Sequence, residues 1–206
     1  MKKIHRFTLV ELLAVMAIIA ILSGLGFGAY TFANTRAKES ATESLLKQIE
    51  AGLESFHTKN GYYPRSAAGG FSAITFTVDS ANNRVTGVDF GDAATKLTYN
   101  STASNRKARM ENEKIESFTK ALDLEAIRKH LNNSRELEDA WGEKIYYRSP
   151  GTFKSGGYDL ISAGPDGEFS KENKDASDAP GVLNSLSRDN FRQDDGTRLC
   201  DDIFNF

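Results

Sequence analysis

The sequence has few of the residues that would equip a small domain with disulfides or catalytic groups. It contains one cysteine, Cys200, and three histidines in 206 residues. A single thiol excludes an intramolecular disulfide framework and any metal site built from several cysteines. The HExxH, GxSxG and P-loop motifs are absent, so we expect no enzymatic activity. We expect His57 and His130 to be exposed surface residues.

The chain also lacks a large excess of charge of either sign. Its formal net charge is -2, so we expect no nucleic-acid partner. The mean hydropathy of -0.45 is typical of a soluble protein, but this average hides a sharp division. Nearly all of the hydrophobicity lies before Tyr30. The length of 206 residues suits one domain, or one domain plus an appended segment.

The apolar run at residues 7–32 contains one charged residue, Glu11. About 26 residues at about 1.5 Å each make about 39 Å of helix, which exceeds a bilayer core of about 30 Å. The residues before the run are basic and include no acid: Lys2, Lys3 and Arg6. The positive-inside rule therefore predicts a cytoplasmic Met1–Arg6, with the chain after about Tyr30 on the other side of the membrane.

Two interpretations of this segment compete with each other. A secretory signal peptide would be cleaved at small residues such as Ser23-Gly24 or those at 26–29. The length of the run and the carboxylate inside it favour a membrane span. A carboxylate in a span costs about 2–3 kcal/mol. Glu11 therefore either reaches water near the interface or finds a positive partner on another subunit.

The segment Phe7-Thr8-Leu9-Val10-Glu11-Leu12-Leu13, followed by apolar residues 14–22, resembles the type III signal of type IV pilins and type II secretion pseudopilins. The resemblance implies that a prepilin peptidase cuts between Arg6 and Phe7 and methylates the new amine. It also implies that Glu11 pairs with the Phe amine of another subunit during assembly. The family normally has Gly before the cut, and Arg6 departs from that pattern.

Beyond the span, the helix is predicted to continue to about Lys59 and to end at Asn60-Gly61, shortly before Pro64. Residues at helical spacing predict an apolar stripe that packs against a sheet: Ala37, Ala41, Leu45, Ile49, Leu53 and Phe56.

The rest of the chain is predicted to form a small antiparallel sheet with one short helix. Alternation predicts strands at Phe71–Val78 and Val85–Phe90, and polar composition predicts a loop at Asn100–Arg109. A short helix is predicted at Ser117–Leu131. The order Asp139-x-Trp-Gly, Tyr-Tyr, Ser-Pro-Gly and Tyr-Asp-Leu-x-Ser162 around two further strands resembles the major (G-type) pseudopilin of type II secretion.

That resemblance also implies a Ca²⁺ site. Its parts are the turn Ala163-Gly164-Pro165-Asp166-Gly167-Glu168 and the C-terminal Asp202-Ile203-Phe204-Asn205-Phe206. The implied ligands are Asp166 and Asp202, then Asp201, with the carbonyls of Ala163 and Glu168. An insertion separates turn and ending, and its acids are further candidates: Asp175, Asp178, Asp189, Asp194 and Asp195. Calcium would order an acidic tail that has little else to keep it ordered. The alternative is that the tail is merely solvated and binds no metal.

Together these features predict an α+β, type IV pilin-like fold in four parts: leader 1–6, transmembrane and assembly helix 7–32, amphipathic helix 33–60 and periplasmic domain 61–206. We expect a single-pass inner-membrane subunit of a type II secretion pseudopilus that drives protein export. Its expected partners are other copies of itself, minor pseudopilins, the prepilin peptidase, the inner-membrane assembly platform and lipid. The alternatives are a type IV pilus subunit for adhesion, motility or DNA uptake, and a membrane-anchored periplasmic binding domain.

Overall fold

The computed structural model describes residues 8–79, 81, 84–169, 183–186, 191 and 203–205, with the backbone alone at 25–27. The chain divides into two compact units, Met1–Lys38 and Glu39–Phe206. One helix of 52 residues, α1 (Leu9–Asn60), contributes to both. The long N-terminal helix predicted from the sequence is thereby confirmed.

In the first unit, the described residues form the apolar part of α1. None of its most apolar 18-residue window is buried, and by length and composition the helix can cross a membrane. Its large apolar side chains are at least half exposed: Leu9, Val10, Leu12, Leu13, Val15, Met16, Ile18, Ile19, Ile21, Leu22, Tyr30 and Phe32. Contiguous apolar surface of this kind is unfavourable in water, so it requires lipid or neighbouring apolar surface around it.

In the second unit, one face of α1 packs on the apolar core. Leu45, Ile49, Leu53 and Phe56 of the predicted stripe are buried, each with at most 2 % of its surface exposed. The prediction is wrong at the start of the stripe, where Ala37 and Ala41 are exposed. The first fully buried position of α1 is Thr42. Its hydroxyl accepts a hydrogen bond from the Ala140 amide at 3.1 Å, which ties this turn of the helix to the domain.

The end of α1 follows the predicted pattern. Gly61 adopts a left-handed conformation with φ of +78°, and its amide donates to the His57 carbonyl at 2.7 Å. Glycine adopts this conformation without a steric penalty, which is why it commonly follows the last turn of a helix.

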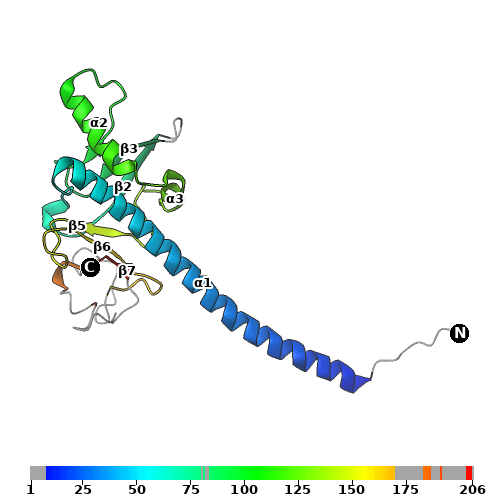
Figure 1. Cartoon of the computed structure of the whole chain (residues 1–206). Coiled ribbons are helices and arrows are strands. Elements are labelled where there is room, and N and C mark those ends of the chain that lie inside the picture. Colours follow the sequence, from blue (N-terminus) through cyan, green and yellow to red (C-terminus); the bar gives the residue numbers. More distant parts are fainter. Residues whose placement is uncertain are drawn as a thin grey trace. The chain divides into compact units, whose positions relative to one another are not determined.

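Two antiparallel sheets pack in this unit. The first has the order β1 (Ser72–Ala73), β5 (Tyr146–Arg148), β6 (Asp159–Ser162) and β7 (Ile203–Phe204), and β5, β6 and β7 lie side by side in Figure 1. The second has the order β2 (Thr75–Asp79), β3 (Arg84–Asp89) and β4 (Leu97–Thr98). The strands predicted at Phe71–Val78 and Val85–Phe90 are confirmed and pair with each other as β2 and β3, but the first is split at Ile74 between the two sheets.

The short helix predicted at Ser117–Leu131, which lies between β4 and β5 in the sequence, is wrong in its boundaries. The chain forms α2 (Arg106–Thr119) and α3 (Leu124–Lys129), each begun by a side-chain cap, Asn105 for α2 and Asp123 for α3. The cap at Asn105 starts the first helix inside the predicted loop. A three-residue 3-10 turn, η1 (Ala67–Gly69), precedes β1.

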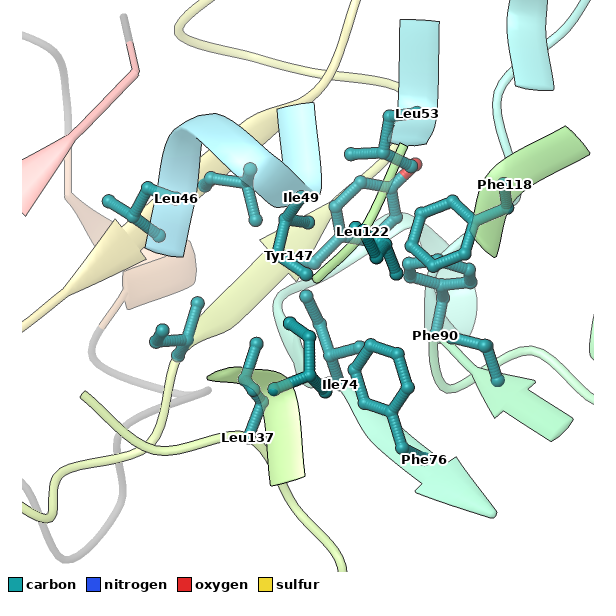
Figure 2. Packing of buried hydrophobic residues seen from close by; sticks show 14 of the residues in the cluster. Leu46, Ile49, Leu53, Ile74, Phe76, Phe90, Phe118, Leu122, Leu137 and Tyr147 are labelled. Atoms are coloured by element: carbon teal, nitrogen blue, oxygen red, sulfur yellow. The ribbon is translucent and has the colours of Figure 1, made fainter. Parts of the chain in front are cut away.

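Side chains from α1, both sheets and α2 form the main apolar core. Figure 2 shows Ile49 and Leu53 of α1 facing Tyr147 of β5, with Phe76, Phe90 and Phe118 beside them. Gly52 allows α1 and α2 to approach closely, because a Cβ at that position would lie 2.9 Å from the Phe118 carbonyl oxygen. The core thus fixes the end of α2 against α1.

A second apolar cluster covers the other face of the first sheet. Alternate residues of each strand belong to the two clusters, as the period of two in a strand requires, and Tyr147 and Leu160 face α1 whereas Tyr146 and Ile161 face away. The second cluster includes buried residues from the C-terminal region: Phe169, Leu183, Phe191 and Phe204. Apolar contacts therefore hold these residues on the sheet.

Candidate functional site

The first turn of α1 carries the predicted assembly carboxylate, Glu11. Its Oε2 accepts hydrogen bonds from the backbone N–H and from the hydroxyl of Thr8, both at 2.8 Å. The Glu11 amide donates in return to Thr8 Oγ1 at 3.3 Å. This reciprocal arrangement is a capping box, in which a threonine and a glutamate three residues later satisfy amides at the helix start.

The capping box was visible in the sequence as Thr8-x-x-Glu11 but was not used in the predictions. It gives Glu11 local hydrogen-bond donors within its own chain but no positive charge. The large side chains around it, including Leu9, Leu12 and Leu13, are apolar and exposed. Arg6 and Phe7, the predicted processing residues, lie outside the described residues.

The candidate calcium turn leaves the end of β6. Gly164 and Gly167 both adopt left-handed conformations, with φ of +72° and +71°. Asp166 Oδ1 accepts from the Glu168 amide at 3.0 Å, which holds the carboxylate over the turn. Ala163, at the start of the turn, is buried in the second cluster.

The C-terminal strand arrives at the same end of β6. Ile203 pairs with Ser162, the residue before Ala163, and Asn205 Oδ1 accepts from the Leu160 amide at 2.7 Å. The fold therefore brings the predicted turn and the predicted ending together along one strand, although they are far apart in the sequence. Asp201, Asp202 and the acids of the insertion, including Asp175, lie outside the described residues.

The donor chemistry at this turn fits Ca²⁺, which prefers carboxylate and carbonyl oxygens on irregular loops. Asp166, Glu168 and the carbonyls of the turn supply such oxygens. In the part of the chain that the structure describes, no three metal-binding side chains cluster together.

Asp139 connects this turn to the turn before β5. Asp139 is 4 % exposed, and its Oδ2 accepts from the Ser162 hydroxyl at 2.6 Å. Its Oδ1 accepts from the amides of Trp141 and Glu143 at 2.8 and 3.0 Å. Sequence analysis placed this aspartate in a family motif without a role, because only the fold brings it to Ser162.

The histidines of the domain occupy structural positions. His57 stacks on Tyr63 with ring centroids 4.3 Å apart, and His130 follows the last turn of α3. Both are half-buried, so the prediction that they are exposed is wrong. An open surface cavity of about 420 Å³ lies between α1 and α2 and is lined by Ser55, Thr58, Lys59, Glu116, Ser117 and Lys120, with no histidine among them.

Comparison with known proteins identifies one family. Residues 119–178 match the family described as type II secretion system (T2SS), protein G. This segment contains α3, β5, β6 and the candidate calcium turn. No curated protein and no solved structure gave a match. The chain is therefore similar to type II secretion protein G, the major pseudopilin, over residues 119–178, and its α+β fold with a long apolar N-terminal helix is consistent with a pilin-like fold.

Proposed function

We propose that this chain is a structural subunit of a type II secretion pseudopilus, which polymerises through α1 and drives protein export across the outer membrane. The observation that carries the proposal is that one chain combines a segment similar to protein G, at residues 119–178, with an exposed apolar run in α1 whose single carboxylate is Glu11. Neighbouring copies of α1 in a filament would cover the apolar surface that is otherwise left to lipid.

The capping box shapes the proposed role of Glu11. Thr8 offers it neutral donors only, so the carboxylate keeps its negative charge uncompensated within the described residues of the first unit. A negative charge in apolar surroundings gains most from a cation nearby. The amine of Phe7 on a second copy would supply that cation after the leader is removed, and the gain would favour the filament over the isolated subunit.

Two variants of Glu11 test this proposal against a role in capping alone. Glu11→Leu removes both charge and cap, whereas Glu11→Gln keeps a capping oxygen and removes only the charge. We expect both variants to insert in the membrane and neither to yield filaments when expressed with the secretion apparatus. Glu111→Leu, on α2, is the matched control and should assemble normally.

Normal filaments from Glu11→Gln would contradict the proposal. If the wild type itself forms no filaments with the secretion apparatus, and both Glu11 variants behave as the wild type does, the result favours the rival function, a membrane-tethered periplasmic binding domain for which α1 is only an anchor. Mass spectrometry of the N-terminus from native membranes gives an independent check, because a methylated Phe7 is expected and an intact Met1 is not. A type IV pilus subunit is the alternative within the same class.

We further propose that the turn at residues 163–168 binds Ca²⁺ together with Asp202 and Asp201. The convergence of this turn and β7 on the end of β6 supports the proposal. Calcium at about 100 times its dissociation constant would stabilise the folded chain by about 2.7 kcal/mol. EGTA should therefore lower the melting temperature of the full chain in detergent by several degrees, and added calcium should restore it.

The calcium proposal has its own matched pair of variants. Asp166→Asn should abolish the response to EGTA, whereas Asp92→Asn, which changes a half-buried aspartate in another turn, should retain it. If the wild-type melting curve ignores EGTA and no calcium stays bound through gel filtration, the proposed site does not exist.

A further inference from the structure

A buried hydrogen-bond network stands behind the candidate calcium turn. Ser162 has none of its surface exposed, and its hydroxyl donates to Asp139 Oδ2 at 2.6 Å. Ser162 Oγ in turn accepts a hydrogen bond from the Gly164 amide at 3.2 Å. Because the hydroxyl hydrogen is directed at the carboxylate, a lone pair of Ser162 Oγ is left to accept from the Gly164 amide of the turn.

Asp139 is itself held from several directions. The amides of Trp141 and Glu143 donate to its Oδ1, and its own amide donates to the Glu143 carbonyl at 2.7 Å. The next residue is tied to α1, because the Ala140 amide donates to Thr42 Oγ1. The carboxylate therefore has a fixed position relative to the packed core of the second unit.

We propose that Asp139 and Ser162 are positioning residues for calcium, which hold the Ala163–Glu168 turn with its carbonyl oxygens aimed at the ion. The inference rests on the proposed calcium site. Neither side chain is assigned as a ligand. Residues that orient the ligands of a metal ion commonly change its affinity by about 10- to 100-fold when they are removed.

The Gly164 conformation explains why the turn needs this support. Its φ of +72° allows the sharp change of direction after β6, but glycine also gives the unfolded turn more freedom than any other residue. Ser162 Oγ restrains that freedom at the Gly164 amide. Without it, calcium would have to order the turn as it binds, and its affinity would fall.

The test uses the full chain in detergent micelles with Tb³⁺ as the probe. Trp141 is the only tryptophan in the chain and belongs to the same network, so its excitation can sensitise the luminescence of a nearby Tb³⁺. Competition with Ca²⁺ then gives the calcium affinity. Ser162→Ala removes the link from Asp139 to Gly164 but leaves Asp139 bonded to the amides of its own turn.

We expect Ser162→Ala to weaken calcium binding about 10-fold. Ser117→Ala is the matched control, because Ser117 is also buried but donates its hydroxyl to the Lys114 carbonyl in α2, and its calcium affinity should equal that of the wild type. An unchanged affinity in Ser162→Ala would overturn the positioning role while leaving the calcium site intact. If the wild type binds neither ion, both proposals fail and the filament proposal is unaffected.

Hydrogen exchange of the wild-type chain gives a second test, which does not depend on the folding of a variant. Calcium should slow amide exchange at residues 139–143 together with residues 162–168, because one network joins them. Slowing confined to residues 162–168 would contradict the inference.

Discussion

Asp159 is a buried residue whose substitution should strongly destabilise the second unit. The side chain has no exposed surface, and five donors converge on its two oxygens. Arg148 supplies two of them, from Nε at 2.9 Å and Nη2 at 2.6 Å. The amides of Thr152, Phe153 and Lys154 supply the others, at 2.8, 3.1 and 2.8 Å.

Asp159→Asn keeps the shape of this side chain and removes its charge. The guanidinium of Arg148 lies between the rings of Phe71 and Phe153, 4.2 and 4.4 Å from their centroids, and is 4 % exposed. It would become a buried cation without its counter-ion, and the new amide N–H₂ would face donors. Removing one partner of a buried ion pair costs about 3–5 kcal/mol.

We therefore expect Asp159→Asn to lower the free energy of unfolding by about 4 kcal/mol. For a domain of this size that is a fall of about 10 °C in melting temperature. Thermal unfolding of the full chain in detergent, followed by near-ultraviolet circular dichroism, measures it. Asp92→Asn is the control and should lose about 1 kcal/mol or less, because Asp92 is only half-buried and accepts from the Ala94 amide and, at 3.4 Å, from the Thr95 hydroxyl. A loss in Asp159→Asn no larger than in this control would refute the reasoning.

Two further predictions concern buried aromatic residues, Phe191 and Tyr158. Phe191→Ala removes a fully buried ring that packs on Phe153 and Phe204, so it should cost about 3–5 kcal/mol and expose the C-terminal segment to limited proteolysis; cleavage as slow as in the wild type would show that this anchor is dispensable. Burial, with the carboxylates of Glu50 and Glu54 nearby, raises the pKa of Tyr158. The stability that the neutral phenol contributes is complete below pH of about 10 and is lost as the pH rises above it. The melting temperature of Tyr158→Phe should therefore fall less than that of the wild type between about pH 9 and 11. An equal fall in the two proteins would contradict that assignment.

Features carried by contiguous residues were predictable from the sequence. The membrane-length helix follows from an uninterrupted apolar run, and its end follows from Asn60-Gly61, because both depend on backbone and solvent preferences of neighbouring residues. The strands near residues 145–147 and 157–162 were found by motif order. The Thr8–Glu11 capping box was equally local and was missed only because Glu11 had been considered for its charge alone.

The parts of the candidate sites that depend on distant residues were not predictable. Nothing near Asp139 indicates that its carboxylate meets Ser162, and nothing near Arg148 indicates that Phe71 covers it. The stripe on α1 was predicted to begin at Ala37, but the buried face begins at Thr42. The position of this first contact depends on where the Ala140 amide lies, which the sequence around Thr42 does not indicate.

The sequence by itself determined that the chain carries an apolar run of membrane length with one acid in it, and that the order of its later motifs resembles that of a G-type pseudopilin. Only the tertiary structure decided that the C-terminal region packs as a second apolar layer, through Leu183, Phe191 and Phe204, and that β7 meets the candidate calcium turn. The physical reason is that helix periodicity and chain polarity are written in neighbouring residues. Which face of a sheet a distant segment covers depends on strand register and on the free energy of burying both surfaces together.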